Sequence, residues 1–308
     1  MRLETVCKVC QQPVFGEYIQ ALGSTWHPDH FLCAACSQPI RERQFVEYQG
    51  QAYHLPCYRL AFAPRCAICG TLIDDEAYQD EFGNIFCIRH NKEYNTCESC
   101  GRLICPQLTG GGLRYSDGRQ VCHQCRKTAI TEHEQAADIF QEINKLLRVN
   151  GLDFGGLHLN VVLLDANSLG RYHADHIGEG RLLGVTLQEI NTSSDGTRHH
   201  EVSGIGILWG LPREMFEEVA AHELGHAWLA VKQIDGLSSW RQEGFCNLLA
   251  FLWLSVQDTA AAKRRIRHLE DNPDAIYGEG YRRVKKILER YSFRELINHV
   301  EQFRTLPV

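Results

Sequence analysis

The hydrophobic pattern divides the chain near residue 126. Before that point apolar residues form short runs between pairs of cysteine and histidine, whereas beyond it they recur at the spacings of helices and strands. Residues 126–149 carry apolar side chains at roughly helical spacing, with Thr131 and Glu134 as a capping box and Gly151 as a stop, and they predict one helix. Three further runs have the character of strands: 157–164, 182–190 and 202–209.

The last third of the chain predicts helices. One apolar, helix-favouring run can be opened by Pro212, and a second begins near Ser238 or Ser239, so we expect two buried helices there. Shorter or amphipathic helical patterns follow at 259–270, 281–290 and 292–303.

Composition limits the class of protein. With 308 residues and 44% hydrophobic content, the chain can form two or three domains and at least one sizeable core. A formal net charge of −6 argues against nucleic-acid binding as its main role. The sequence contains no apolar run of about 18 residues and no charged-then-apolar leader, so we expect neither a membrane span nor a signal peptide.

Cysteine usage separates the two parts of the chain further. Thirteen of the 14 cysteines precede residue 126, mostly in pairs with two intervening residues and with histidines nearby. Such pairs bind metal more often than they form disulfides, so we expect a reducing, cytoplasmic compartment. Cys105 and Cys246 fall outside the pairs and are expected to be ordinary buried thiols.

The first four pairs follow one another in the order of a LIM domain. They are Cys7 and Cys10, His27 and His30, Cys33 and Cys36, and His54 and Cys57. This order resembles a LIM domain, in which Trp26 and Phe31 would pack around the ions. The resemblance implies that the first two pairs bind one zinc ion and the last two another, with every position filled by a protein ligand, so both ions are structural.

Residues 63–128 repeat this scheme with one departure. The pairs are Cys66 and Cys69, Cys87 and His90, Cys97 and Cys100, and Cys122 and Cys125. Six residues separate His90 from Cys97 where a LIM domain has two, so the angle between the two halves is expected to differ. The LIM pattern again implies two structural zinc ions, one for each two consecutive pairs.

A catalytic metal site is predicted in the helix that follows Pro212. His222, Glu223 and His226 form the pattern H-E-x-x-H, and residues four apart on a helix face the same side, so both histidines can bind one ion. This geometry suits zinc, with Glu223 as general base for the activated water. Glu243, on the first turn of the next helix, is the expected third ligand. The alternative is a chance match on a buried helix.

Other residues are candidates to line a substrate cleft. Strand 202–209 is predicted to be an edge strand that binds substrate in extended form, with a plain sheet strand as the alternative. Tyr277 or Tyr281 is expected to donate to the oxyanion, with core packing as the alternative. A polar loop offers three further candidates: Tyr172, His173 and His176.

Taken together, the motifs resemble the plant family of LIM-containing, ubiquitin-activated metallopeptidases that limit organ size. Beyond the LIM pattern, the likeness is carried by residues 207–213, 221–228, 243–246 and 303–308. The resemblance implies a gluzincin-like endopeptidase that cuts protein substrates, with ubiquitin or ubiquitinated proteins as partners. The plant proteins carry ubiquitin-interacting helices ahead of the LIM domain, and no such segment precedes Cys7 here, so dependence on ubiquitin is left open.

We therefore expect a multidomain α+β protein. Residues 1–62 are a LIM domain, residues 63–128 a LIM-like zinc module, and residues 129–308 a zincin-type metallopeptidase with a small sheet and several helices. One catalytic and four structural zinc ions are expected, and the zinc modules would recruit partners or gate the cleft. The rival function is a non-catalytic LIM adaptor, against which Glu223 argues because a structural zinc helix needs no carboxylate there.

Overall fold

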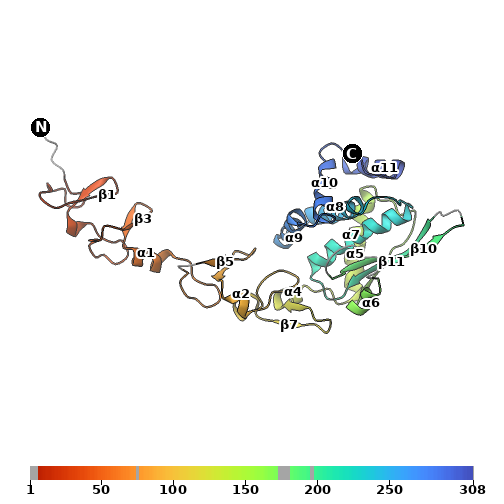
Figure 1. Ribbon diagram of the computed structural model, residues 1–308, viewed down its shortest axis with the longest axis horizontal. Coiled ribbons are helices and arrows are strands. Elements are labelled where there is room, and N and C mark those ends of the chain that lie inside the picture. Colours follow the sequence, from red (N-terminus) through yellow and green to blue (C-terminus); the bar gives the residue numbers. More distant parts are fainter. Residues whose placement is uncertain (1–5, 74–75, 173–180, 195–197, 308) are drawn as a thin grey trace. The chain divides into compact units, whose positions relative to one another are not determined.

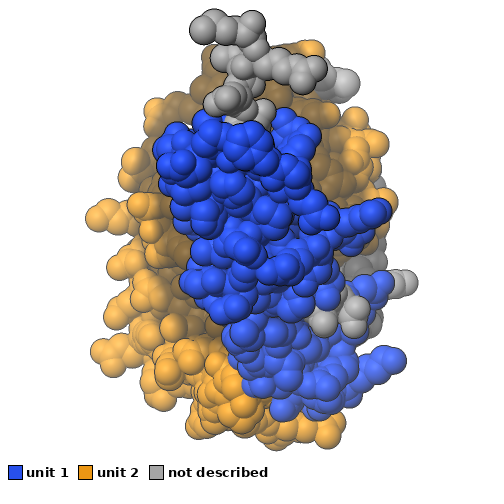
Figure 2. Space-filling model, turned by 90° about the vertical axis from the view of Figure 1, so that its left-hand side faces the viewer, with its two compact units in different colours: residues 1–95 blue, residues 96–308 orange. Residues whose placement is uncertain are grey.

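The chain forms two compact units, Met1–Asn95 and Thr96–Val308 (Figure 2). The structure, a computed structural model, describes residues 6–73, 76–172, 181–194 and 198–307. The boundary between the units falls within residues 63–128, between the second and third ligand pairs of the segment that the sequence predicts as one zinc module.

The first unit is built from small hairpins and short helices. Its two-stranded antiparallel sheets are β1 (Ile19–Ala21) with β2 (Ser24–Trp26), β3 (Val46–Tyr48) with β4 (Gln51–Tyr53), and β5 (Ala77–Gln79) with β6 (Ile85–Cys87). The helices are η1 (Pro28–His30), α1 (Leu55–Phe62) and α2 (His90–Glu93). Trp26 and Phe31 pack as expected, with ring centroids 5.6 Å apart, but the apolar core here contains few residues.

The second unit opens with a small cysteine-rich region and continues into a helical domain (Figure 1). The first part comprises α3 (Pro106–Thr109), β7 (Gly112–Arg114), β8 (Gln120–Cys122) and α4 (His123–Lys127). The larger part contains α5 (His133–Val149), β9 (Val161–Leu164), α6 (Ala166–Gly170), β10 (Gly184–Thr192), β11 (Arg198–Leu208), α7 (Arg213–Val231), α8 (Ser239–Ser255), α9 (Ala260–Asp271), α10 (Gly278–Ile287) and α11 (Phe293–Phe303). Both parts together give the mixed fold that the sequence predicts.

The sheet of the second unit has the order β10-β11-β9. Strand β11 pairs antiparallel with β10 and parallel with β9, so it is the central strand. The prediction that residues 202–209 form an edge strand is therefore wrong. Period-2 patterning and glycine content do not reveal which strands flank a segment, and here β10 and β9 lie at the two edges of the described sheet.

The single helix predicted over residues 126–149 is interrupted. Helix α4 ends at Lys127 and α5 begins at His133, so the expected capping box at Thr131 does not form. Between them the backbone is extended and pairs with the segment ahead of α7: Ile130 N donates to Leu211 O at 2.8 Å, and Gly210 N donates to Ile130 O at 2.9 Å. Tertiary pairing outweighs the local helical pattern at this point.

Close packing of α7 against α8 places the predicted site. Gly225 faces Cys246, and a Cβ on Gly225 would lie 2.8 Å from the Cys246 sulfur, so only glycine permits this approach of the two helices. Gly244 similarly faces Gly280 on α10, where a Cβ would lie 2.4 Å from the Gly280 carbonyl oxygen.

Among the described helices none is both long and apolar enough to cross a membrane.

The cysteine-rich part of the second unit is attached to the segment that leads into α7. Arg119 is buried and donates from its guanidinium to Trp209 O at 2.7 Å. The Tyr115 ring packs on the Trp209 ring with centroids 5.5 Å apart, and Trp209 Nε1 donates to Thr131 O at 3.1 Å. The third and fourth ligand pairs of the segment 63–128 are thus tied to the helical domain.

Candidate metal centre and zinc clusters

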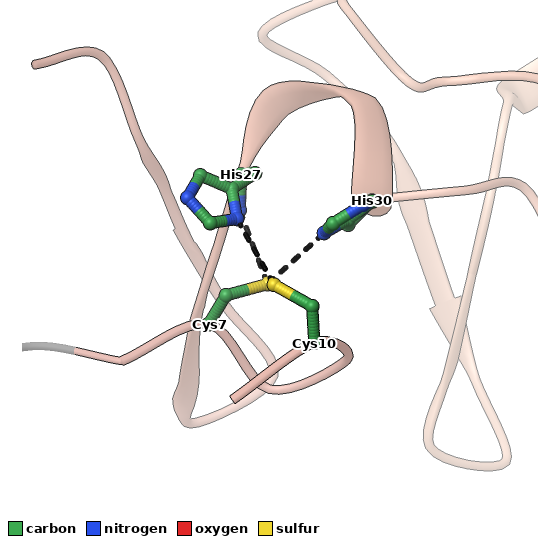
Figure 3. A group of neighbouring side chains, drawn as sticks. All are labelled: Cys7, Cys10, His27 and His30. Carbon is green, nitrogen blue, oxygen red and sulfur yellow. Dashed lines mark hydrogen bonds between the residues drawn. The ribbon is translucent and has the colours of Figure 1, made fainter. Parts of the chain in front are cut away.

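The first ligand group gathers two sulfurs and two imidazoles at one point (Figure 3). The Cys7 sulfur lies 3.4 Å from His30 Nδ1, and the Cys10 sulfur lies 3.4 Å from His27 Nδ1. In a tetrahedron with ordinary zinc bond lengths, a sulfur and a nitrogen ligand are about 3.5 Å apart. The spacing therefore fits a zinc ion at the centre of the four residues.

The remaining three cysteine groups repeat this arrangement. They are Cys33, Cys36, His54 and Cys57; Cys66, Cys69, Cys87 and His90; and Cys97, Cys100, Cys122 and Cys125. Sulfur pairs in the last two groups, Cys69 with Cys87 and Cys100 with Cys122, lie 3.9 and 3.8 Å apart. Two thiolates on one zinc are separated by about 3.8 Å, so these groups also fit the ion.

Backbone amides in the turns that carry the ligand pairs stabilise the thiolate form of the cysteines. His27 N donates to the Cys7 sulfur at 3.4 Å, and Cys122 N donates to the Cys97 sulfur at 3.3 Å. Although burial raises the pKa of Cys7, the backbone amides of Cys10 and His27 outweigh it and lower that pKa to about 5. The turns thus hold the sulfurs in the form that binds zinc.

His90 provides a second test of fit. Its Nδ1 lies 2.5 Å from a Glu93 carboxylate oxygen, which fixes the proton on Nδ1. Its Nε2 is buried and has no hydrogen-bond partner among the residues that the structure describes. A buried nitrogen lone pair beside three cysteines is what a zinc ligand requires.

The H-E-x-x-H histidines converge on the glutamate of the next helix. His222 Nε2 and His226 Nε2 are 3.1 Å apart on α7, and Glu243 Oε2 on α8 lies 3.2 and 3.5 Å from them. Nitrogen and oxygen ligands of a tetrahedral zinc are about 3.3 Å apart, close to all three distances. Glu243 is only 5% exposed, and in the described part of the chain the two imidazole nitrogens are the near partners of its Oε2, so a metal ion between the three atoms would satisfy this buried oxygen.

Side chains of α8 orient both imidazoles. Asn247 Oδ1 lies 2.8 Å from His222 Nδ1, and Gln242 Nε2 lies 3.1 Å from His226 Nδ1. Asn247 accepts the Nδ1 proton of His222, so the Nε2 lone pair of His222 faces the metal position; exchanging the nitrogen and oxygen of the Gln242 amide by a flip gives His226 the same arrangement. Neither residue was predicted from the sequence, although Asn247 follows Glu243 by four positions and so lies on the same helical face.

Glu223 is held against strand β10. Its side chain is nearly buried, and the Thr186 hydroxyl lies 3.0 Å from Glu223 Oε2 and 3.0 Å from Glu223 O. A Cβ on Gly184 would lie 2.9 Å from Glu223 Oε1, so the strand backbone passes directly beside the carboxylate. Thr186 was also missed, because its place depends on the sheet rather than on sequence spacing.

Of the two candidate tyrosines, the structure brings Tyr277 to the histidines. Its ring stacks near His222, with centroids 6.5 Å apart and planes 28° apart, and Asn247 Nδ2 donates to its carbonyl at 3.1 Å. Burial and the charges of Glu243 and Glu223 raise the pKa of Tyr277, so its hydroxyl remains a proton donor at neutral pH. Tyr281 is fully buried and packs against Phe251, in the manner of a core residue.

The other candidates are placed differently. Cys246, expected to be an ordinary buried thiol, is fully buried but has its sulfur within 4.8 Å of ligand atoms of both His222 and His226. Burial raises its pKa well above the usual value, which favours the neutral thiol. The loop candidates His173 and His176 lie outside the described residues.

Glu243 also controls the protonation of the histidines. Burial lowers the pKa of His222 and of His226, but hydrogen bonding to Glu243 and its negative charge outweigh burial and raise each pKa to about 9. Burial raises the pKa of Glu243, whereas the two histidines outweigh that effect and lower it. Binding of a metal ion must therefore displace protons from this site.

Comparison with known proteins gives a family match in each of the two parts of the chain. Residues 7–62 match the LIM domain family, and residues 174–268, which include the histidines and Glu243, match the DA1-like family described as Protein DA1. Protein DA1 of Arabidopsis thaliana is 25% identical over 98% of this chain and 68% of its own length. LIM domain-containing protein HDR3 of Oryza sativa subsp. japonica is 26% identical over 98% of this chain and 74% of its own length. Protein DA1-related 1 of Arabidopsis thaliana is 25% identical over 98% of this chain and 66% of its own length.

Proposed function

For a chain that joins a LIM domain to a DA1-like domain, with homologues among the DA1 and DA1-related proteins along nearly its whole length, we propose the function of a zinc-dependent endopeptidase. The single observation that carries the proposal is the triangle of His222 Nε2, His226 Nε2 and Glu243 Oε2, with Glu223 beside it. Three protein ligands leave a fourth zinc position open, which is the arrangement of catalytic rather than structural sites.

The chemistry divides between the ion and the side chains. Zinc, when bound, supplies a Lewis acid that lowers the pKa of water to about 7 and polarises a carbonyl group. Glu223 accepts a proton from the attacking water and returns it to the leaving amine, and the Thr186 hydroxyl orients its carboxylate. Tyr277, whose raised pKa keeps it protonated, is the candidate donor to the oxyanion.

Strand β10 is the element best placed to align a protein substrate. It lies at the edge of the sheet, and its residues Gly184 and Thr186 adjoin Glu223. An extended chain added to this edge would present its backbone to the general base. We thus assign to β10 the binding of extended substrate that the sequence predicted for residues 202–209.

The other groups complete the proposal. The four cysteine groups would hold four structural zinc ions and the α7–α8 site one catalytic ion, five in all. The zinc modules would recruit protein substrates or gate access to them, and ubiquitin or ubiquitinated proteins are among the partners to test. A non-catalytic adaptor is the second candidate, favoured by the LIM match and by exposed apolar side chains such as Phe15, which is 82% exposed.

Cleavage of an unfolded protein tests the proposal. The full chain should degrade casein, and a zinc chelator should stop the reaction. Glu223→Gln should lower the rate of cleavage by at least about a hundredfold while the zinc content is unchanged. Glu214→Gln, the same change in the first turn of α7, serves as the matched control and should remain active. Cleavage by the Glu223 variant at the wild-type rate would remove the base assignment. No cleavage by the zinc-loaded wild type, with or without ubiquitin, would favour the adaptor.

A further inference from the structure

A groove lies in the second unit where the cysteine-rich hairpin meets the start of the helical domain. Its volume is about 810 Å³. The lining residues come from β7, from the loop after it, from the end of α4, from the α4–α5 connection and from the position after β11: Leu113, Tyr115, Arg126, Lys127, Ala129, Thr131, Glu132 and Trp209. None of these belongs to a metal-ligand group, and none is Glu223 or Tyr277, so the groove is built from residues other than those of the proposed peptide hydrolysis.

The floor of the groove is a rigid aromatic platform. Trp209 keeps 39% of its surface exposed although its indole nitrogen donates to Thr131 O and its carbonyl accepts from Arg119. The Tyr115 ring packs on it, and the Arg119 guanidinium lies 4.9 Å from the centroid of Tyr115. An exposed aromatic side chain that is already fixed loses little entropy on binding, and such residues dominate the affinity of protein interfaces.

The rim of the groove is cationic in a chain of net charge −6. Arg126 and Lys127 are exposed at the end of α4, and neither forms an ion pair with a carboxylate in the described part of the chain. Glu132 is the one acidic residue that lines the groove, and its carboxylate accepts from the Thr131 hydroxyl at 3.3 Å. The local charge therefore favours an anionic ligand.

We propose that this groove docks an extended acidic peptide segment of a partner protein, with one apolar side chain seated on Trp209 and Tyr115 and flanking carboxylates paired with Arg126 and Lys127. The apolar floor selects the anchor residue, and the cationic rim selects its neighbours. Nucleic acid is disfavoured because Arg126 and Lys127 are the only basic side chains among the described residues that line the groove, too few to hold a run of phosphates. The docking goes beyond the proposed peptidase and does not depend on it.

Fluorescence anisotropy with labelled peptides tests the docking. The protein is the full chain carrying Glu223→Gln, so that no peptide is cleaved. A twelve-residue Asp/Glu peptide with a central leucine should bind, whereas the same peptide with serine in place of leucine, or with lysine in place of every acid, should bind at least about tenfold more weakly. Arg126→Glu with Lys127→Glu should weaken the first peptide by about tenfold.

Lys145→Glu with Lys286→Glu is the matched control, because it changes the net charge equally at exposed positions outside the groove. Retained binding in this control, together with loss in the groove variant, supports the proposal. Equal loss in both variants, equal binding of the serine or lysine peptide, or displacement of the acidic peptide by single-stranded oligonucleotide would overturn it. Because binding is measured without turnover, inactive wild-type enzyme would leave this result unaffected.

Discussion

The cysteine groups and the α7–α8 site both gather side chains suited to holding a metal ion, but they are built from different parts. In the cysteine groups four protein ligands come from short turns, and backbone amides such as His27 N support the sulfurs. In the α7–α8 site three ligands come from two long helices, and side chains such as Asn247 orient them. A turn can hold a closed cluster with its own backbone, whereas an open site needs a surrounding core to keep its ligands in place.

Because of this difference, we expect a metal ion to stabilise the fold at the cysteine groups and to serve catalysis at the α7–α8 site. Around the cysteine groups the apolar clusters contain few residues, so zinc ions held there would take the place of the core that such small regions lack. The α7–α8 site sits in the large apolar cluster of the second unit, which should fold around it with or without the ion. Loss of metal is therefore expected to unfold the first kind of site and to inactivate the second.

The largest effect is expected from Glu243→Gln. The amide removes the negative charge that completes the ligand triangle, so the chain should lose one of its metal ions and its peptidase activity by at least about a thousandfold. Its folding should remain intact because the surrounding core is unchanged. Metal analysis together with circular dichroism checks this; a variant that keeps all its metal or unfolds would contradict the distinction between the two kinds of site.

In contrast to Glu243→Gln, Cys122→Ser should mainly reduce folding stability. Removing one of four thiolates from a closed group should destabilise the second unit by roughly 3–5 kcal/mol, because that group supports the contacts of Arg119 and Tyr115 with Trp209. Cys36→Ser, the same change in the first unit, is the control and should leave the unfolding of the second unit unaffected. Thermal unfolding followed by tryptophan fluorescence measures the effect, and equal behaviour of the two variants would contradict it.

Asn247→Ala should weaken metal binding at the α7–α8 site by about 10–100-fold without emptying the cysteine groups. The substitution removes the acceptor that fixes His222 Nδ1 and the donor to the Tyr277 carbonyl. Asn247→Asp keeps the acceptor and should retain most of the affinity. Competition with a chelator of known affinity measures the change, and an equal loss in the two variants would show that the acceptor is not what matters.

The metal affinity of the same site should also depend on pH. Because Glu243 raises the pKa of His222 and His226 to about 9, protons compete with zinc below that pH. Apparent affinity should therefore rise between pH 6 and 9, by about tenfold per pH unit for each proton displaced, and level off above it. Calorimetric titration in buffers of different ionisation enthalpy counts the released protons; release of none would contradict the raised values.

Sequence spacing predicted which of these side chains come together but not what supports them. The pairs of cysteine and histidine are local patterns on turns, and the structure brings them together in four groups. It also places Glu243 beside His222 and His226. Asn247 could have been found by helical periodicity, since it shares a face with Glu243. Thr186 could not, because its contact with Glu223 depends on the register of β10 against β11 and on how the sheet meets α7.

Two elements were misjudged for a related reason. Residues 128–132 have a helical pattern but pair as extended chain with the segment before α7, and residues 202–209 read as an edge but lie between two strands. In both cases a partner distant in sequence decides the structure. Local propensity carries no information about such a partner.

The junction at Asn95 and Thr96 determines where the chain can be cut and recombined. A splice between residues 128 and 129, where the cysteine pattern ends, would strip Arg119 and Tyr115 from Trp209 and break the backbone pairing of Thr128 with Arg213. A splice at residue 95 leaves all of these contacts within one piece. Fusion, truncation or exchange of the front modules should therefore be tolerated at that junction and fail at the one that the cysteine spacing suggests.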